Sequence, residues 1–280
     1  MTHHFLMCRP DHFAVSYTIN PWMDPASWAR DNRMLTATSQ REWGGLLDAM
    51  LDAEAKIHLV PSAPGLPDLV FTANAGLVDG RRFVVSRFRH QERRGEARYD
   101  AEWFAAHGYE VLEIRAEADI CFEGAGDALP YGHSLLAGYR FRSDFKAHSL
   151  LAETLSIPVL SVELVDARFY HVDLTFCPLD GRRAIVNPHA WDRYGRTVVE
   201  RLVPEPLVLE LDEALSFCAN SVVIGTNMVM PACPPRVGRI LESWGFDVCV
   251  SPVTEFMKAG GGVRCLTLAL DVRLGRNFRS

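Results

Sequence analysis

Residues 169–187 read FYHVDLTFCPLDGRRAIVN, and this stretch contains the pattern that decides the fold. Two runs rich in apolar residues, Val172–Leu179 and Arg183–Asn187, flank Asp180-Gly181, a dipeptide that favours the tight turn of a β-hairpin. His171 and Asp173 stand where the chain enters the first run. The segment therefore predicts two short paired strands with polar, reactive side chains at their entrance.

The same pattern recurs along the chain. Further hairpins are predicted for Ala75–Val78 with Phe83–Ser86, Ala128–Pro130 with Ser134–Ala137, and Ser221–Ile224 with Met228–Met230. A last strand, Cys265–Leu270, is expected to pair with the opening strand, Phe5–Arg9. Amphipathic helices are predicted for Gln40–Ala55, Tyr99–His107, Ser143–Leu155, Trp191–Leu202 and Pro235–Trp244.

Each repeating unit, a helix followed by a hairpin, has about the size of one blade in a radial array of sheets. In such an array the starts of equivalent strands converge on the central axis, so the residues that enter the hairpins should meet. These residues are Asn74, Asp127 after Glu123, His171 with Asp173, Asn220, and Cys265. The alternative is an open α/β sheet with polar strand ends.

The composition is that of a globular protein, with 280 residues, 48% hydrophobic and 23% charged. A net charge of -6 argues against a nucleic-acid partner, because phosphate binding needs a basic surface. No apolar stretch is long enough to span a bilayer, and residues 1–10 lack the apolar core of a secretory signal. We expect a single catalytic domain over residues 1–280, with no membrane partner.

The seven cysteines are scattered and form neither a C-x-x-C pair nor a Cys/His cluster with zinc spacing. We therefore expect reduced thiols in the cytoplasm and no metal site. The sequence also lacks a Walker loop, a G-x-G-x-x-G and a G-x-S-x-G pattern, so no nucleotide cofactor is expected.

Cys265 is the thiol with the most suggestive setting, since it follows Gly260-Gly261-Gly262-Val263-Arg264. A glycine run permits close backbone approach and positive φ, and its free amides can face an anion. A thiol there would be partly exposed and electropositive, which lowers a cysteine pKa. The alternative is a loop that precedes a buried core thiol.

Carboxylates and a histidine lie in two other segments. Strand alternation predicts that His171 and Asp173 share one face, where an imidazole could move protons and a carboxylate could hold a cation. The segment 122–127 places Glu123 and Asp127 in a glycine-rich turn that a planar group could enter. The alternatives are a structural His/Asp pair and an acidic surface turn.

Polar residues before the first hairpin, and arginines elsewhere in the chain, could bind charged groups. Asp68 and Asn74 mark the two ends of a strand-like run, and Asp suits an ammonium group while Asn both donates and accepts. Arg93 and Arg94, and likewise Arg140 and Arg142 on either side of Phe141, offer the planar fork that suits a carboxylate. Turn chemistry and ordinary surface arginines are the alternatives.

Together these segments resemble the guanidine-modifying, or pentein, superfamily, and in particular its dimethylarginine dimethylaminohydrolase and amidinotransferase branch. The resemblance implies a five-bladed α/β propeller and a cofactor-free hydrolase. It implies that Cys265 is the nucleophile, His171 the acid/base and Glu123 its partner that also binds the guanidinium. It further implies that Asp173 binds the guanidinium, that Arg93 and Arg142 hold the substrate carboxylate, and that Asp68 lies near the α-amine.

Asn74 departs from the dimethylarginine hydrolases, which commonly have Asp there. The segment Phe71-Thr72-Ala73-Asn74-Ala75-Gly76 is similar to arginine dihydrolase domains, which convert arginine to ornithine, carbon dioxide and two ammonia. The sequence thus favours an arginine dihydrolase that binds a small molecule, arginine or a methylated arginine, and it leaves a homo-oligomer open. The alternatives are a dimethylarginine hydrolase and a catalytically silent guanidine-binding protein.

Overall fold

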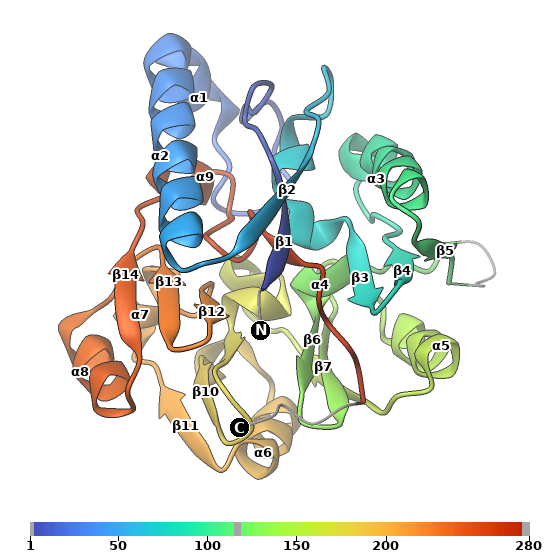
Figure 1. Cartoon of the computed structure of the whole chain (residues 1–280), viewed down its shortest axis with the longest axis vertical. Coiled ribbons are helices and arrows are strands. Elements are labelled where there is room, and N and C mark those ends of the chain that lie inside the picture. Colours follow the sequence, from blue (N-terminus) through green and yellow to red (C-terminus); the bar gives the residue numbers. More distant parts are fainter. Residues whose placement is uncertain (1–2, 115–118, 276–280) are drawn as a thin grey trace.

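A computed structural model describes residues 3–114 and 119–275. Five three-stranded sheets surround a central axis, and the longer helices lie on the outside of this ring (Figure 1). The chain is a five-bladed α/β propeller, as expected, and the alternative of one open sheet is wrong.

Four of the five sheets follow one rule of connection. A hairpin of two antiparallel strands comes first, a helix follows, and the third strand returns parallel to the second. In the sheet formed by Phe176–Pro178, Arg183–Val186 and Glu205–Val208, Ile185 of the middle strand pairs with Cys177 on one side and with Leu207 on the other. The middle strand is therefore covered on both edges, and the third strand faces outward.

Four of the blades are each built from one continuous segment of the chain. Their strands are β3 Gly76–Asp79, β4 Arg82–Val85 and β5 Glu110–Leu112; β6 Ala128–Tyr131, β7 Ser134–Tyr139 and β8 Val159–Glu163; β9 Phe176–Pro178, β10 Arg183–Val186 and β11 Glu205–Val208; and β12 Val222–Ile224, β13 Asn227–Met230 and β14 Asp247–Val250.

The first blade is built from both ends of the chain. Strand β15, Leu268–Ala269, pairs antiparallel with β1, His4–Cys8, which pairs in turn with the parallel strand β2, Lys56–Val60. The predicted pairing of the last strand with the opening strand is confirmed, although β15 begins at Leu268 and leaves Cys265 in a turn. This pairing closes the ring and fixes the position of the chain that leads from Cys265.

The helices connect strands or shape the loops near the axis. They are α1 Pro25–Arg30, α2 Asn32–Asp52, α3 Arg94–Ala106, α4 Gly124–Asp127, α5 Phe145–Leu155, α6 Arg193–Leu202, α7 Leu211–Leu215, α8 Pro235–Ser243 and α9 Thr254–Met257. Helix α2 buries Leu35, Trp43, Leu46 and Met50, whose spacing of three, four and eight residues forms one apolar face. No helix among the residues that the structure describes is long and apolar enough to cross a membrane.

The four predicted hairpins are confirmed, but two features differ from the sequence expectations. Residues 172–174 form a 3₁₀ turn instead of extending strand β9, and the run from Asp68 to Asn74 consists of two 3₁₀ turns instead of a strand. The third strand of each blade has no counterpart among the predicted elements. These strands are short and only partly buried, as in Glu205–Val208, so they lack an apolar pattern.

Gly76 in β3 allows a close approach that no other residue permits. A Cβ atom on Gly76 would lie 2.3 Å from the carbonyl oxygen of Val84 and 2.4 Å from the ring of Phe83. Gly45, in α2, has nothing within 4 Å of the equivalent position. The two glycines therefore differ in what an added methyl group would meet.

We expect Gly76→Ala to destabilise the protein by about 2 kcal/mol or more, because backbone atoms of β4 would have to move. Gly45→Ala should stabilise it by about 0.5–1 kcal/mol, because glycine is unfavourable in an exposed helix interior. Urea unfolding of both variants measures these changes. Equal midpoints for the two variants would show that the close approach in β3 does not constrain the fold.

Candidate active site

The residues that precede the first strand of each blade meet at the axis. Cys265 precedes β15, Asn220 precedes β12, and Asp173 precedes β9. Glu123 lies at the start of α4, directly before β6, and Asn74 ends the 3₁₀ turn before β3. All five side chains are buried. The convergence that the repeat predicted is confirmed.

The thiol of Cys265 lies between an amide and a carboxylate. Its Sγ atom is 3.2 Å from Nδ2 of Asn220 and 3.3 Å from Oδ2 of Asp173. The backbone N–H of Cys265 donates to Oδ1 of Asn220 at 3.2 Å. Asn220 therefore holds both the backbone and the sulfur of this residue, while the S–H group can donate to Asp173.

The expected electropositive, partly exposed setting of Cys265 is wrong. The residue is only 2% exposed, and burial together with the negative charge of Asp173 raises the pKa of the thiol well above its ordinary value. Burial also raises the pKa of Asp173 to about 7, although Cys265 and Arg264 act in the opposite direction. Without a bound cation this thiol is protonated at neutral pH.

The glycine run before Cys265 allows close packing, and of its amides that of Gly262 faces the sulfur and acts to lower the pKa of the thiol. A Cβ atom would lie 2.6 Å from the Tyr170 hydroxyl at Gly260, 2.3 Å from the Phe71 ring at Gly261, and 2.7 Å from Oδ1 of Asn220 at Gly262. Gly260 also has a φ of 90°. The amides of Gly260 and Gly261 donate to carbonyls of α9 and are not free. The glycines thus allow this loop to lie against the walls of the site.

His171 and Glu123 form a buried acid–base pair. Nε2 of His171 lies 2.8 Å from Oε2 of Glu123, and Nη1 of Arg142 donates to the same oxygen at 3.0 Å. Burial alone would raise the pKa of Glu123, but Arg142 and His171 hold that pKa well below its usual range. Glu123 is therefore ionised and can support a protonated imidazole.

His171 and Asp173 do not share one face of a strand. Because Val172–Leu174 is a 3₁₀ turn, His171 reaches Glu123 while Asp173 reaches Cys265. The two side chains nevertheless belong to the same buried cluster. Asp127, the other acid of the glycine-rich turn, accepts from the N–H groups of Ser143 and Val172 and connects neighbouring blades.

Arg93 occupies the other side of the site. Nη1 of Arg93 donates to Oδ1 of Asn74 at 2.9 Å, and Nη2 donates to Oε2 of Glu96 at 2.8 Å. Nε of Arg93 lies 3.9 Å from Oδ2 of Asp68. Burial raises the pKa of Asp68, against the effect of Arg93. The other oxygen of Asp68, Oδ1, lacks a well-formed hydrogen bond among the described residues, and the Tyr17 hydroxyl is the nearby donor that acts on this carboxylate.

One cavity joins the thiol to most of these groups. Cys265, Asp68, Asn74, Arg93 and Arg142 line it together with Phe71, Tyr170 and residues of two loops. Its volume is only about 10 Å³, roughly the space of one water molecule.

A loop closes this cavity on one side. Ile19 and Asn20 belong to the lining; the carbonyl of Ile19 accepts from Arg142, and the Asn20 amide donates to the carbonyl of Ala259. A ligand of amino-acid size needs more room than this cavity offers, so its walls must move to admit one. The other predicted residues lie behind the lining: Glu123 contacts Arg142, Asp173 contacts Cys265, and His171 contacts Glu123.

Two residues have roles that sequence reasoning missed, Asn220 and Tyr170. In the sequence Asn220 marks only the entrance to a hairpin, yet it bonds to Cys265 twice. Tyr170 donates to the carbonyl of Gly260, and the Arg142 guanidinium lies 4.4 Å from the centre of its ring. The repeat position is a signal for Asn220, whereas nothing in the sequence distinguishes Tyr170 from a core aromatic. No group of three or more metal-binding side chains occurs within residues 3–114 and 119–275.

The arrangement suits covalent catalysis on a cationic electrophile. A buried thiol has carboxylate oxygens beside it, and Oδ1 of Asp173 has no partner among the described residues. A planar cation could satisfy these oxygens and lower the thiol pKa at the same time. An imidazole held by an ionised carboxylate is available to transfer protons.

Comparisons with known proteins agree with this chemistry. The family model for N,N-dimethylarginine dimethylhydrolase of the eukaryotic type matches residues 9–272. The chain is 44% identical over 268 residues to the bifunctional arginine dihydrolase/ornithine cyclodeaminase AgrE of Nostoc sp., and the match covers 94% of this chain but only 37% of that protein. It is 36% identical to the N(G),N(G)-dimethylarginine dimethylaminohydrolase of Mycobacterium tuberculosis, over 96% of this chain and 86% of that enzyme.

The fold of this chain is also similar to a solved structure of an arginine dihydrolase domain. The N-terminal domain of the cyanobacterial arginine dihydrolase ArgZ, as a cysteine-to-serine mutant bound to substrate, superposes with a TM-score of 0.89 at 39% identity. The match covers 96% of this chain and 98% of that domain. Sequence and structure together show that the chain belongs to the dimethylarginine dimethylaminohydrolase family, within the pentein superfamily of five-bladed α/β propellers.

Proposed function

We propose that this chain is an arginine dihydrolase, which converts arginine and two water molecules to ornithine, two ammonia and carbon dioxide. The observation that carries the proposal is the neutral amide of Asn74 in the same cavity as the Cys265 thiol. The similarity to proteins named as arginine dihydrolases supports it. The chain spans little more than a third of the length of AgrE, so the proposal concerns only the dihydrolase reaction.

In the first half-reaction Cys265 is the nucleophile. The guanidinium of arginine lies beside Asp173 and gives the thiol the positive neighbour that the empty site lacks, so the thiolate forms as substrate binds. The sulfur attacks the guanidino carbon, His171 passes a proton to the departing nitrogen, and ammonia leaves. Water then breaks the carbon–sulfur bond, His171 accepts its proton, and citrulline remains in the site.

Glu123 acts through His171. Because its carboxylate stays ionised, it stabilises the imidazolium that forms between the two proton transfers. Arg142 shares the same carboxylate oxygen, which limits the negative charge that His171 experiences. We propose His171 as acid/base and Glu123 as the group that orients and supports it.

The amino-acid end of the substrate lies toward Arg93, Arg142 and Asp68. Both arginines line the cavity, and each can form further charge-assisted bonds to a carboxylate. Oδ1 of Asp68, which lacks a well-formed hydrogen bond among the described residues, suits the α-ammonium group. Arg93 and Arg142 are already paired with Glu96 and Glu123, so the substrate carboxylate would join existing ion pairs.

The side chain of Asn74 determines whether the reaction stops at citrulline or continues to a second hydrolysis. Its Oδ1 accepts from Arg93, and its Nδ2 lies 3.4 Å from the carbonyl of Glu123, so both neighbours fix the orientation of the amide. An aspartate would direct an oxygen at that carbonyl and add a third acid around Arg93. The neutral amide keeps a donor on this wall, which can bond the uncharged citrulline.

In the second half-reaction Cys265 attacks the ureido carbon of the retained citrulline. The second ammonia leaves, and water releases the carbamate of ornithine, which loses carbon dioxide. Each attack forms one carbon–sulfur bond and each hydrolysis breaks it, so the thiol is regenerated. The same side chains act in both halves.

A dimethylarginine hydrolase is the second candidate. The family model and the 36% identity to the Mycobacterium tuberculosis enzyme favour it. Both candidates use the same nucleophile and differ in the leaving group and in the fate of citrulline. Product analysis therefore separates them.

We also propose that the chain acts as one catalytic domain over residues 1–280 in the cytoplasm. The near-complete coverage of the N-terminal domain of ArgZ supports a single domain. All seven cysteines are free, which fits a reducing compartment.

With arginine as substrate we expect ammonia and ornithine in a ratio of two to one, and with dimethylarginine little dimethylamine. Mass spectrometry of the products tests this ratio; citrulline as the end product, or release of dimethylamine alone, would overturn the dihydrolase assignment.

Agmatine should react slowly, because it lacks the carboxylate that Arg93 and Arg142 bind. The same product analysis measures its turnover.

Cys265→Ser should lower turnover by a factor of at least about 10³, whereas the exposed-thiol control Cys249→Ser should remain active.

The free enzyme should react slowly with iodoacetamide at neutral pH. Because the pKa of Cys265 is raised, its thiolate fraction should increase about tenfold per pH unit between pH 7 and 9. The rate of alkylation at Cys265 is measured by peptide mapping in a Cys249→Ser background. A rate that stays constant from pH 6 to 9 would mean that the thiol is ionised without substrate.

Asn74→Asp should retain the first hydrolysis but release citrulline. Replacing a donor by an acceptor in the dry site costs about 1–3 kcal/mol, so the ornithine-to-citrulline ratio should fall by about tenfold or more. Asn227→Asp, the same change at the start of β13, is the control and should leave the ratio unchanged. An unchanged ratio in Asn74→Asp would remove Asn74 from the second step.

A further inference from the structure

A second and much larger cavity lies apart from the site of Cys265. It has a volume of about 840 Å³, within the range of small-molecule sites, and shares no lining residue with the first cavity. Its walls come from β1, β2, the β3–β4 turn, the end of α3, and the chain that follows β15. The proposed hydrolysis uses none of these groups.

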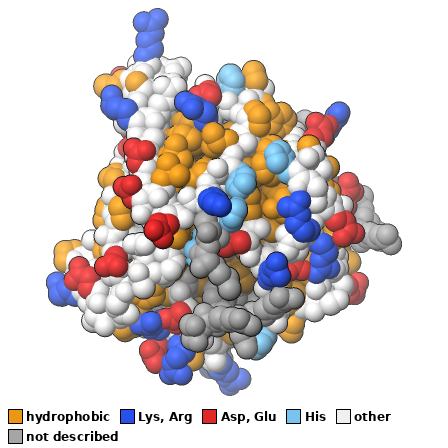
Figure 2. All heavy atoms as spheres, in the orientation of Figure 1, with side chains coloured by type: hydrophobic (Ala, Val, Ile, Leu, Met, Phe, Trp, Pro, Cys, Tyr) orange, Lys and Arg blue, Asp and Glu red, His pale blue; other side chains and the backbone are white. Residues whose placement is uncertain are grey.

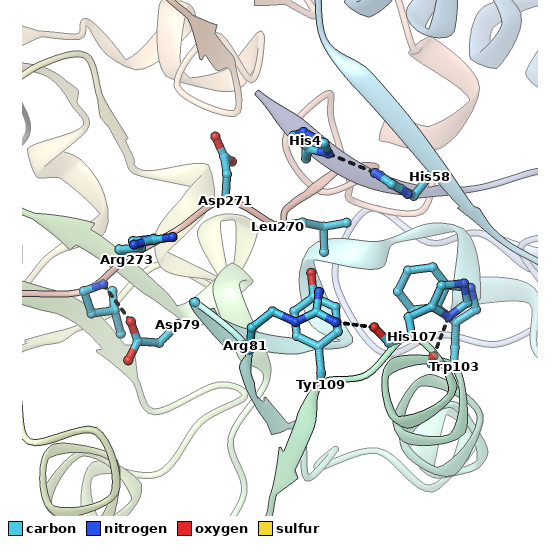
Figure 3. A pocket seen from close by; sticks show the side chains of 12 residues that line it. His4, His58, Asp79, Arg81, Trp103, His107, Tyr109, Leu270, Asp271 and Arg273 are labelled. Atoms are coloured by element: carbon cyan, nitrogen blue, oxygen red, sulfur yellow. Dashed lines mark hydrogen bonds between the residues drawn. The ribbon is translucent and has the colours of Figure 1, made fainter. Parts of the chain in front are cut away.

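Basic side chains gather around this cavity. Figure 3 shows these side chains around Leu270. In this view His4 and His58 lie above it, Arg81 lies below it, and Arg273 lies to its left. Figure 2 shows histidines (pale blue) and Lys or Arg side chains (dark blue) on this face of the molecule beside an apolar patch, with Asp or Glu side chains among them. The cavity thus combines positive charge with apolar surface.

The two acids that line the cavity are already paired. Asp79 accepts from the guanidinium of Arg82 and from the N–H of Leu274, and Asp271 lies 3.1 Å from Nδ1 of His3. Neither Arg82 nor His3 belongs to the lining. Arg82 thus compensates the charge of Asp79, whereas Asp271 faces a histidine that is charged only when protonated and keeps its negative charge at the edge of the cavity.

The two arginines lack acidic partners among the described residues. Arg81 donates to the carbonyl of His107, and its guanidinium lies 4.2 Å from the centre of the Tyr109 ring. Arg273 is exposed and makes no hydrogen bond or ion pair within residues 3–114 and 119–275. Both guanidinium groups have N–H donors available for a ligand.

The histidines crowd one another. Nδ1 of His4 lies 3.0 Å from Nε2 of His58, and the two rings are stacked with centroids 5.3 Å apart. Burial and then the nearby His4, His107 and Lys56 lower the pKa of His58. The pair therefore shares one hydrogen bond, and His58, which this environment keeps neutral, adds no fixed charge to the cavity.

We propose that this cavity binds a small organic oxyanion, whose charged group pairs with Arg273 and Arg81 and whose body lies against Leu270 and Trp103. Multivalent phosphates and carboxylates share the required chemistry, because an arginine fork binds either group. One wall is the chain that follows β15, and β15 itself leads from the turn that holds Cys265, so the ligand would contact the continuation of that segment.

Isothermal titration calorimetry with pyrophosphate, ATP and citrate as separate probes tests the proposal. We expect saturable binding of at least one probe with one site per chain at low ionic strength. Stronger binding of citrate would identify carboxylate chemistry, and stronger binding of ATP than of pyrophosphate would show that the organic body contributes. The absence of saturable binding by all three probes would overturn the proposal.

Variants locate the binding site. Arg273→Gln removes a side chain without internal contacts among the described residues, and should weaken binding about five- to tenfold. Arg33→Gln, an equal change of charge on exposed α2, should alter affinity less than about twofold. Arg81→Gln should also weaken binding, provided that its thermal unfolding matches the parent. Affinity that is unaffected by Arg273→Gln, or a probe that arginine displaces competitively in Cys265→Ser, would overturn the assignment to this cavity.

Discussion

The site depends on one buried carboxylate. Glu123, which is fully buried, accepts from Arg142 and interacts with His171 through the same oxygen, while its other oxygen accepts from the N–H of Arg89. A buried charge without partners is strongly unfavourable, so each of these groups requires the others. Because they come from different blades, the pairing also fixes how the blades meet at the axis.

The environment of the Cys265 thiol differs from that of Glu123, because its charged neighbour is an acid and not a positive group. Cys265 is next to an acid instead of a base, and this setting keeps it protonated and unreactive while the site lacks a cation. A guanidinium reverses the local electrostatics when it binds, so the proposed substrate supplies part of the activation. The arrangement favours electrophiles with N–H donors, since the oxygens of Asp68 and Asp173 would otherwise stay unsatisfied. The α-ammonium and ureido N–H groups of citrulline can donate to these oxygens, and the donor of the Asn74 amide adds to its retention.

Much of the fold could be predicted from local pattern. Turn dipeptides such as Asp180-Gly181 mark the hairpins, and the polar residue before each hairpin marks the axis. The third strands could not be predicted, because β11 and its equivalents are short and half-exposed and are held by pairing with distant residues. The environment of Cys265 could not be predicted either, since the acid beside it is contributed by a segment 92 residues away. The glycines near Cys265 correctly predict a close approach, but only the folded chain shows that they approach Phe71, Tyr170 and Asn220.

The most direct test of the proposed mechanism is whether citrulline itself forms a covalent bond with Cys265. Citrulline labelled with carbon-13 at the ureido carbon is mixed with the enzyme, the reaction is quenched with acid during turnover, and the peptides are mapped by mass spectrometry. We predict that labelled carbon is attached to the peptide containing Cys265 and is absent from Cys265→Ser. Formation of ornithine from citrulline with no label on Cys265, or with label on another residue, would contradict the mechanism.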